Sequence, residues 1–178
     1  MSEFWVPKSA LIKTHNVQSV SIDYSKYSHR PPLDHQKTAI EKLAGSKRFI
    51  LADDMGLGKT TSTIIAALET GAKKILIVCP ASLKINWQRE IANYSDRPVF
   101  IAEGKKFSTE DDFVIVNYDI LKNFHDTDPK KKEESILLQA NFDLVILDEA
   151  HMISNVQAQR TKIINNIIGL RSCRVEFF

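Results

Sequence analysis

A glycine-rich segment of the chain has the residue types needed to bind phosphate. Residues 56–60 read Gly-Leu-Gly-Lys-Thr. Gly56 and Gly58 allow the backbone to curl so that its N–H groups point at an anion, and the helix expected next adds its positive N-terminal end. Lys59 could then reach the β- and γ-phosphates of a nucleotide, and the Thr60 hydroxyl could bind Mg²⁺. An aspartate stands where the strict pattern has its first glycine, so a glycine-rich turn with a solvent-facing lysine is the alternative.

A second segment could supply the metal site that a nucleotide needs. Residues 144–147 form an apolar run that ends in Asp148 and Glu149. In open α/β sheets, ligands bind at the carboxyl ends of the strands. Asp148 is therefore the candidate ligand of Mg²⁺, directly or through water, and Glu149 is the candidate group that polarises the attacking water. Two such carboxylates can also be ordinary solvated residues, but a phosphate loop followed by an acidic strand end predicts nucleotide binding.

Strand-like and helix-like patterns alternate along the chain, which predicts an α/β fold with a mostly parallel sheet and helices on both faces. Continuous apolar runs indicate buried strands, and glycines stop several of the expected helices. Ser82 is expected to cap a helix that carries Trp87, for which core packing is favoured over a base-stacking platform. The expected strands are 49–52, 74–80, 98–102, 113–117, 142–147 and 174–178, and the expected helices are 34–45, 59–69, 82–91 and 157–168.

The chain is expected to hold one domain, residues 31–178, after an irregular lead-in at residues 1–30 that prolines interrupt. Residues 125–135 are expected to form an exposed loop. Acidic residues flank the lysines at 130–132, so a solvated loop is favoured there over a phosphate-binding patch.

The composition limits the class of protein. Of the 178 residues 43% are apolar and 26% are charged, and 24 basic against 22 acidic residues give a net charge of +2. This balance does not by itself indicate a nucleic-acid partner. No apolar run approaches the length of a membrane span, and no signal peptide is evident. We therefore expect a soluble protein of the cytoplasm, nucleoid or nucleus. Cys79 and Cys173 could form at most one disulfide bridge, and Cys79 lies in an apolar run that favours a buried free thiol, which fits a reducing compartment.

Several segments together resemble the Snf2-type members of helicase superfamily 2. Residues 53–60, Asp-Asp-Met-Gly-Leu-Gly-Lys-Thr, resemble the family's phosphate loop, and residues 148–151, Asp-Glu-Ala-His, are a form of its second motif. Residues 75–87 look like the next DNA-facing motif, residues 114–121 are similar to the one after it, and His35-Gln36 resembles the glutamine motif. The resemblance covers about residues 30 to 170. The double aspartate and the Asn-Tyr-Asp of the later motif look most like the annealing-helicase branch.

The resemblance implies a RecA-like P-loop lobe that binds ATP with Mg²⁺, and a role for each matching residue. Gln36 would bind the adenine edge, and His151 would couple the nucleotide site to neighbouring motifs. The family usually has proline where this chain has Asp34, and often threonine or serine near Asn117. Phosphates and Mg²⁺ would be held by Gly56, Gly58, Lys59 and Thr60, with Asp148 and Glu149 in the roles given above, and the implied contacts to one DNA strand are Ser82, Lys84 and Asn117.

The resemblance also implies a second RecA-like lobe, whose arginines complete the ATP site. The strand expected at 174–178 is where the family's next motif would begin, so we expect these residues to hold the first lobe alone. Weak, sequence-independent binding to the DNA backbone and slow ATP hydrolysis are then expected. The alternatives are a truncated, non-catalytic module that binds nucleotide or a partner, and a metabolic phosphate-loop kinase, which residues 148–151 disfavour.

Overall fold

The strands form one parallel sheet. The computed structural model of the chain describes residues 20–46, 48–50, 57–125, 135–169 and 174–177. Within these ranges, six strands pair in the order β1-β6-β5-β2-β4-β3, and every pairing is parallel. The predicted α/β class is confirmed. The strands are β1 Arg48–Ile50, β2 Ile75–Cys79, β3 Val99–Ile101, β4 Phe113–Asn117, β5 Leu144–Leu147 and β6 Arg174–Phe177.

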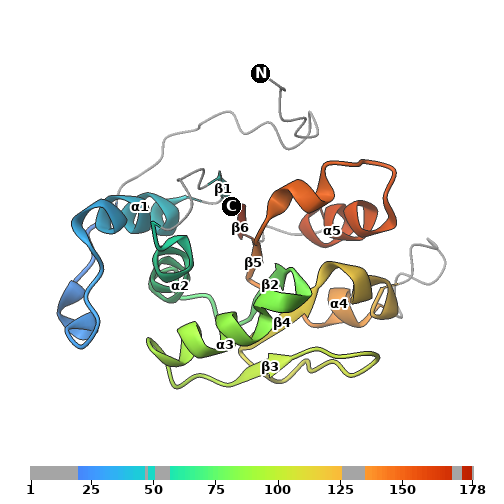
Figure 1. Cartoon of the computed structure of the whole chain (residues 1–178), viewed down its shortest axis with the longest axis horizontal. Helices are drawn as coiled ribbons and strands as arrows, with labels where there is room; N and C mark the ends of the chain where they lie inside the picture. Colours follow the sequence, from blue (N-terminus) through green and yellow to red (C-terminus); the bar gives the residue numbers. More distant parts are fainter. Residues whose placement is uncertain (1–19, 47, 51–56, 126–134, 170–173, 178) are drawn as a thin grey trace.

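Helices cover both faces of the sheet, which Figure 1 shows edge-on between them. The helices α1, α2 and α3 lie on one side, and α4 and α5 lie on the other. The helices are α1 Asp34–Gly45, α2 Lys59–Glu69, α3 Lys84–Ala92, α4 Ile136–Gln139 and α5 Gln159–Gly169, with 3-10 helices η1 Tyr24–Tyr27, η2 Ala81–Leu83, η3 Tyr118–Asn123 and η5 Ala150–Ile153.

The central strands are apolar except for Asn117, which ends β4, because both of their faces are covered. Every residue of β2, β4 and β5 is buried. Successive side chains of a strand point to opposite faces. Ile75 and Ile77 therefore pack with side chains of α2 and α3, whereas Leu76 and Val78 pack with those of η3, α4 and α5. This double burial is why uninterrupted apolar runs in the sequence predicted the strands correctly.

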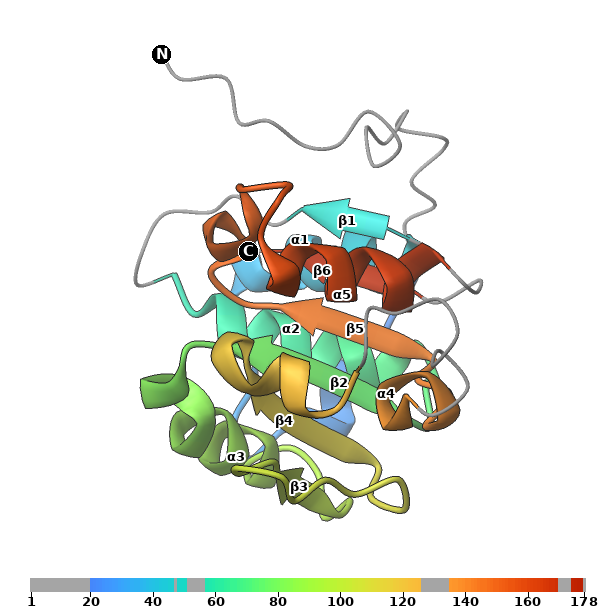
Figure 2. The ribbon, with the colours of Figure 1, turned by 90° about the vertical axis from the view of Figure 1, so that its right-hand side faces the viewer.

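The carboxyl ends of the parallel strands meet at one edge of the sheet, on the left in Figure 2. The segments that follow β2, β4 and β5 lie there. The first turn of α2 lies there too (Figure 2). The parallel topology thus gathers segments that are far apart in the sequence, and this carboxyl edge is where ligands bind in sheets of this kind.

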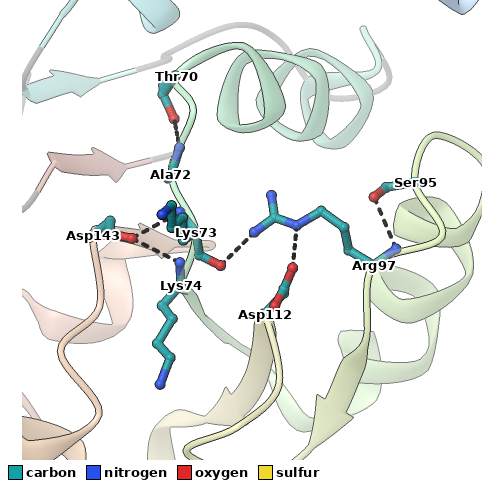
Figure 3. A network of polar contacts seen from close by, with 8 residues as sticks. All are labelled: Thr70, Ala72, Lys73, Lys74, Ser95, Arg97, Asp112 and Asp143. Atoms are coloured by element: carbon teal, nitrogen blue, oxygen red, sulfur yellow. Dashed lines mark hydrogen bonds and ion pairs between the residues drawn. The ribbon is translucent and has the colours of Figure 1, made fainter.

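Polar contacts join neighbouring segments at the opposite edge of the sheet, where the strands begin (Figure 3). Asp143, just before β5, accepts hydrogen bonds from the backbone N–H groups of Lys73 and Lys74, both at 2.9 Å. Arg97 pairs with Asp112 at 2.6 Å and donates to the carbonyl of Lys73 at 2.5 Å. The segments that precede β2, β3, β4 and β5 are therefore tied to one another.

The segment before α1 packs against α2 and α3. Tyr27 of η1 is buried among side chains of α1 and α2, and its hydroxyl donates to Glu69 at 2.5 Å. Arg30 forms an ion pair with Glu90 of α3 at 3.3 Å. The domain boundary placed at residue 30 stays a prediction.

Two local predictions are wrong. Ser82 does not cap a helix, because it lies within η2, and α3 begins at Lys84 without a side-chain cap. The loop predicted to be exposed is buried at both ends, where His125 and Ser135 are each 2% exposed and bond to one another. Asn166 of α5 contacts the other ring nitrogen of His125 at 3.2 Å.

Other predictions fall on Gly56, the lysines at 130–132 and Cys173, which lie outside the described residues. Cys79 is buried and free, as predicted, and burial raises the pKa of its thiol to about 12. Among the described helices, none has the length and apolar character required to cross a membrane.

Candidate functional site

The first turn of α2 carries residues predicted to bind phosphate. Lys59 and Thr60 open the helix, and Gly58 is its N-cap. Backbone N–H groups in a first turn lack partners within the helix, and with the helix dipole they attract anions. Gly58 has a φ of 73°, in the left-handed region that residues with a side chain rarely adopt. The local backbone therefore needs glycine at this position.

Gln36 of α1 holds the segment that leads into α2. Its side-chain amide donates to the carbonyls of Leu57 at 3.1 Å and Gly58 at 3.4 Å, and its oxygen accepts from the backbone N–H of Leu33 at 2.9 Å. A Cβ on Gly58 would lie 2.3 Å from the Gln36 amide nitrogen. Gln36 thus supports the phosphate-binding turn, and its predicted contact with adenine stays a prediction.

Asp148 follows β5 directly and is buried, with 7% of its surface exposed. The indole Nε1 of Trp87 donates to its Oδ2 at 2.9 Å, and the Tyr118 hydroxyl donates to its backbone carbonyl at 2.7 Å. Burial raises the pKa of Asp148, while the Trp87 hydrogen bond and the charge of Lys59 oppose that rise. The first turn of α2, which begins with Lys59, lies at the same carboxyl edge of the sheet as the end of β5, which Asp148 follows (Figure 2).

Glu149 has a different environment from its neighbour. Its φ is 55°, one of two positive values outside glycine among the described residues, and such strain is concentrated at functional sites. Its Oε2 lies 3.0 Å from Nδ1 of His151, and both side chains are partly exposed. One buried and one partly exposed carboxylate suit the two roles predicted for them, Asp148 as a ligand of Mg²⁺ and Glu149 as the group that polarises water.

The donor set fits Mg²⁺. In the described parts of the chain, no group of three or more His, Cys, Asp or Glu side chains could hold a metal ion. Mg²⁺ does not require such a cage, because one or two carboxylates, substrate phosphates and water complete its octahedron. The buried carboxylate of Asp148 and the Thr60 hydroxyl in the first turn of α2 are a set of that kind. Their roles as ligands stay predictions.

The residues predicted to contact DNA follow β2 and end β4, so they share the carboxyl edge. Ser82 in η2 is exposed. Lys84 donates from Nζ to the carbonyl of Ala102 at 3.0 Å, which leaves further ammonium donors on the same nitrogen. Asn117 is only 6% exposed. Ser82 is thus the most accessible of the three, and none of the DNA contacts is tested by the structure.

The sequence alone did not reveal the contacts of Trp87 and Tyr118 with Asp148. Trp87 was predicted to pack in the core, and it does, with 1% of its surface exposed. A buried indole N–H nevertheless needs an acceptor. This requirement is the signal that the sequence offered, because a tryptophan predicted to be buried implies a buried acceptor for its N–H.

Comparison with known proteins places the chain in a family. A family model described as SNF2-related domain matches residues 35–172. The chain is 34% identical over 145 residues to the uncharacterized ATP-dependent helicase YqhH of Bacillus subtilis, covering 77% of this chain and 24% of that protein. It is 36% identical over 138 residues to a probable global transactivator of Orgyia pseudotsugata multicapsid polyhedrosis virus, covering 70% and 28%. It is 32% identical over 140 residues to the ISWI chromatin-remodeling complex ATPase ISW1 of Saccharomyces cerevisiae, covering 69% and 11%.

The need for glycine at position 58 gives a first prediction. Gly58→Ala should lower the free energy of unfolding by more than the roughly 1–2 kcal/mol that a left-handed alanine costs, because its Cβ also meets Gln36. Gly71→Ala is the matched control, because Gly71 has a similar φ of 72° but no atom lies within 4 Å of the position that a Cβ would take there. Urea unfolding of the two variants measures the difference. Equal losses would show that the Gln36 contact does not restrict this turn.

The burial of Asp148 gives a second prediction. Its raised pKa means that the folded state binds the proton more tightly than the unfolded state does. The stability contributed by protonated Asp148 is therefore lost as the pH rises through its pKa in the folded state. Asp148→Asn should therefore raise the Tm in metal-free buffer at pH 7, by about 2–4 °C for each kcal/mol recovered. The difference in Tm between Asp148→Asn and the wild type should become smaller as the pH falls toward 5. Glu149→Gln, at a partly exposed carboxylate, is the control, and a lower Tm for Asp148→Asn would contradict the argument.

Proposed function

This chain belongs to the SNF2-related domain family, and we propose on that basis that it is the ATP-binding lobe of a DNA-dependent ATPase that moves along duplex DNA. The observation that carries the proposal is that the first turn of α2, which begins with Lys59, and the buried Asp148, which follows β5, lie at the same edge of the sheet (Figure 2). A phosphate-binding lysine and a carboxylate suited to a metal ion are the two halves of a Mg²⁺–ATP site.

The chemistry assigned to each residue follows from its environment. Lys59 and the N–H groups of α2 bind the phosphates, and Thr60 and Asp148 hold Mg²⁺. The metal ion, when bound, neutralises charge on the phosphate oxygens. Glu149, open to solvent and paired with His151 at 3.0 Å, accepts a hydrogen bond from water and orients it toward the terminal phosphate.

Contact with DNA is proposed for the same edge of the sheet. Ser82, Lys84 and Asn117 can donate to phosphate oxygens, which carry no base sequence. The net charge of +2 adds little long-range attraction. We therefore propose weak binding to the DNA backbone without sequence preference, with affinity that falls as salt rises.

The names of the relatives support this proposal without extending it to a whole protein. YqhH is named an ATP-dependent helicase and ISW1 an ATPase of a chromatin-remodeling complex. The chain spans about a quarter or less of the length of these two proteins. The second lobe, the annealing-helicase branch and an intracellular setting in cytoplasm, nucleoid or nucleus are parts of the proposal. No observation favours the non-catalytic module over it.

Removal of the phosphate-binding lysine tests the proposed function. Lys59→Ala should weaken the binding of Mg²⁺–ATP or Mg²⁺–ADP roughly ten- to hundredfold, because it removes a charge-assisted contact of about 1.5–3 kcal/mol. Lys162→Ala, an exposed lysine on α5, is the matched control. Isothermal titration calorimetry measures both affinities. Equal affinity for the wild type and Lys59→Ala would reject this site.

The need for a second lobe gives a kinetic prediction. The 178-residue chain alone should hydrolyse ATP slowly or undetectably, even with DNA, because an arginine from across the cleft is worth about 10³–10⁵ in rate. Arg160 of α5 lies 4.0 Å from Asp119, on the side of the lobe that carries η3. A phosphate-release assay with and without a second RecA-like lobe, in cis or in trans, measures the gain. Fast DNA-stimulated hydrolysis by the chain alone, abolished by Glu149→Gln, would overturn this view.

A further inference from the structure

One oxygen of the Asp148 carboxylate has a fixed partner inside the protein. Trp87 of α3 is 1% exposed, and its Nε1 donates to Asp148 Oδ2 at 2.9 Å. The indole ring packs in the apolar cluster that α2 and α3 form with one face of the sheet. Because the ring is enclosed, the direction of its N–H is fixed. The hydrogen bond therefore selects one orientation of the carboxylate.

The backbone of the same residue is held from a second direction. Tyr118, the first residue of η3, is 2% exposed, and its hydroxyl donates to the Asp148 carbonyl at 2.7 Å. The backbone N–H of Asp148 bonds to the carbonyl of Val78 at 2.9 Å. The side chain, the carbonyl and the N–H of Asp148 are thus held by three different segments.

These contacts begin in the segments predicted to face DNA. Trp87 lies on α3, which opens with Lys84, and Tyr118 directly follows Asn117. Each aromatic residue is thus close in sequence to a candidate DNA contact and donates a hydrogen bond to Asp148. A shift of α3 or η3 would therefore move a hydrogen-bond donor of the carboxylate.

We propose that Trp87 is a positioning residue that orients the Asp148 carboxylate for Mg²⁺, and so joins the DNA-facing helix α3 to the metal site. The proposal rests on the proposed function, since it assumes that the site binds a Mg²⁺–nucleotide. Partners that orient a metal ligand commonly change metal affinity when they are removed. A tryptophan that merely fills the core would affect stability without any special effect on Mg²⁺.

The test separates nucleotide binding from its dependence on Mg²⁺. The affinity for ADP is measured by calorimetry in excess Mg²⁺ and again in EDTA, for the wild type and Trp87→Phe. Phenylalanine keeps an aromatic ring and lacks the N–H. The Mg²⁺ ratio, which is the affinity in excess Mg²⁺ divided by the affinity in EDTA, should fall roughly tenfold in Trp87→Phe. The affinity in EDTA should stay close to that of the wild type. An unchanged ratio would overturn the proposal.

Two further variants control for packing and for folding. Phe113→Leu removes aromatic volume from the same apolar cluster and should leave the Mg²⁺ ratio unchanged. Tyr118→Phe removes only a hydroxyl and should lower the ratio by a smaller factor, so it serves as a second test if Trp87→Phe does not fold. A fall of the ratio in Phe113→Leu equal to that in Trp87→Phe would overturn the proposal, because any loss of packing would then suffice.

Fluorescence gives a readout that leaves the site intact. The chain has two tryptophans, Trp5 and Trp87, so Trp5→Phe makes Trp87 the sole indole reporter. Adding Mg²⁺ to the ADP complex should change the Trp87 emission, and EDTA should reverse the change. No change in the Trp87 emission on saturation with Mg²⁺ would overturn the proposed link between Trp87 and the metal site. If the wild type binds ADP in neither condition, the proposed function itself fails, whereas normal binding with an unchanged ratio rejects only the role of Trp87.

Discussion

The burial of one carboxylate at the end of β5 is the constraint on which the rest of the site depends. Asp148 is 7% exposed, and a charged group taken out of water is costly unless hydrogen bonds or opposite charge compensate it. Hydrogen bonds supply part of this compensation, because Trp87 donates to its carboxylate and Tyr118 donates to its carbonyl. The positions of α3 and η3 are thus both linked to this residue.

The parallel sheet makes that arrangement possible. β5 pairs with β6 on one side and β2 on the other, so Asp148, the residue that follows the strand, lies in the interior. One residue further, the chain turns through the left-handed backbone of Glu149 and reaches solvent. Asp148 and Glu149, which are adjacent in the sequence, therefore lie in opposite environments, the first buried and the second partly exposed. A fold that buried both would lose access to water, and one that exposed both would lose the fixed orientation of Asp148.

What the sequence could predict depended on whether the signal was local. The runs 74–80 and 113–117 predicted β2 and β4 because double burial leaves no polar interruption, and the bounds of α2 were predicted because Gly58 and Gly71 flank it. The Ser82 cap was wrong because η2 already continues into α3. Burial of His125 depends on Ser135 and Asn166, partners that no local pattern reveals. The order of the motifs led to the phosphate and metal assignments, which stay predictions, whereas the Trp87 contact needed the folded structure.

The two edges of the sheet divide stability and function between them. At the edge where the strands begin, Asp143 and Arg97 join neighbouring segments through satisfied polar contacts. The carboxyl edge instead holds a buried charge and the left-handed backbone of Glu149, features that cost stability. Such features persist only where the surrounding structure over-determines them. The tied edge and the doubly buried central strands supply that surplus, so the strain and charge at the carboxyl edge are carried by a scaffold anchored at the other end of the same strands.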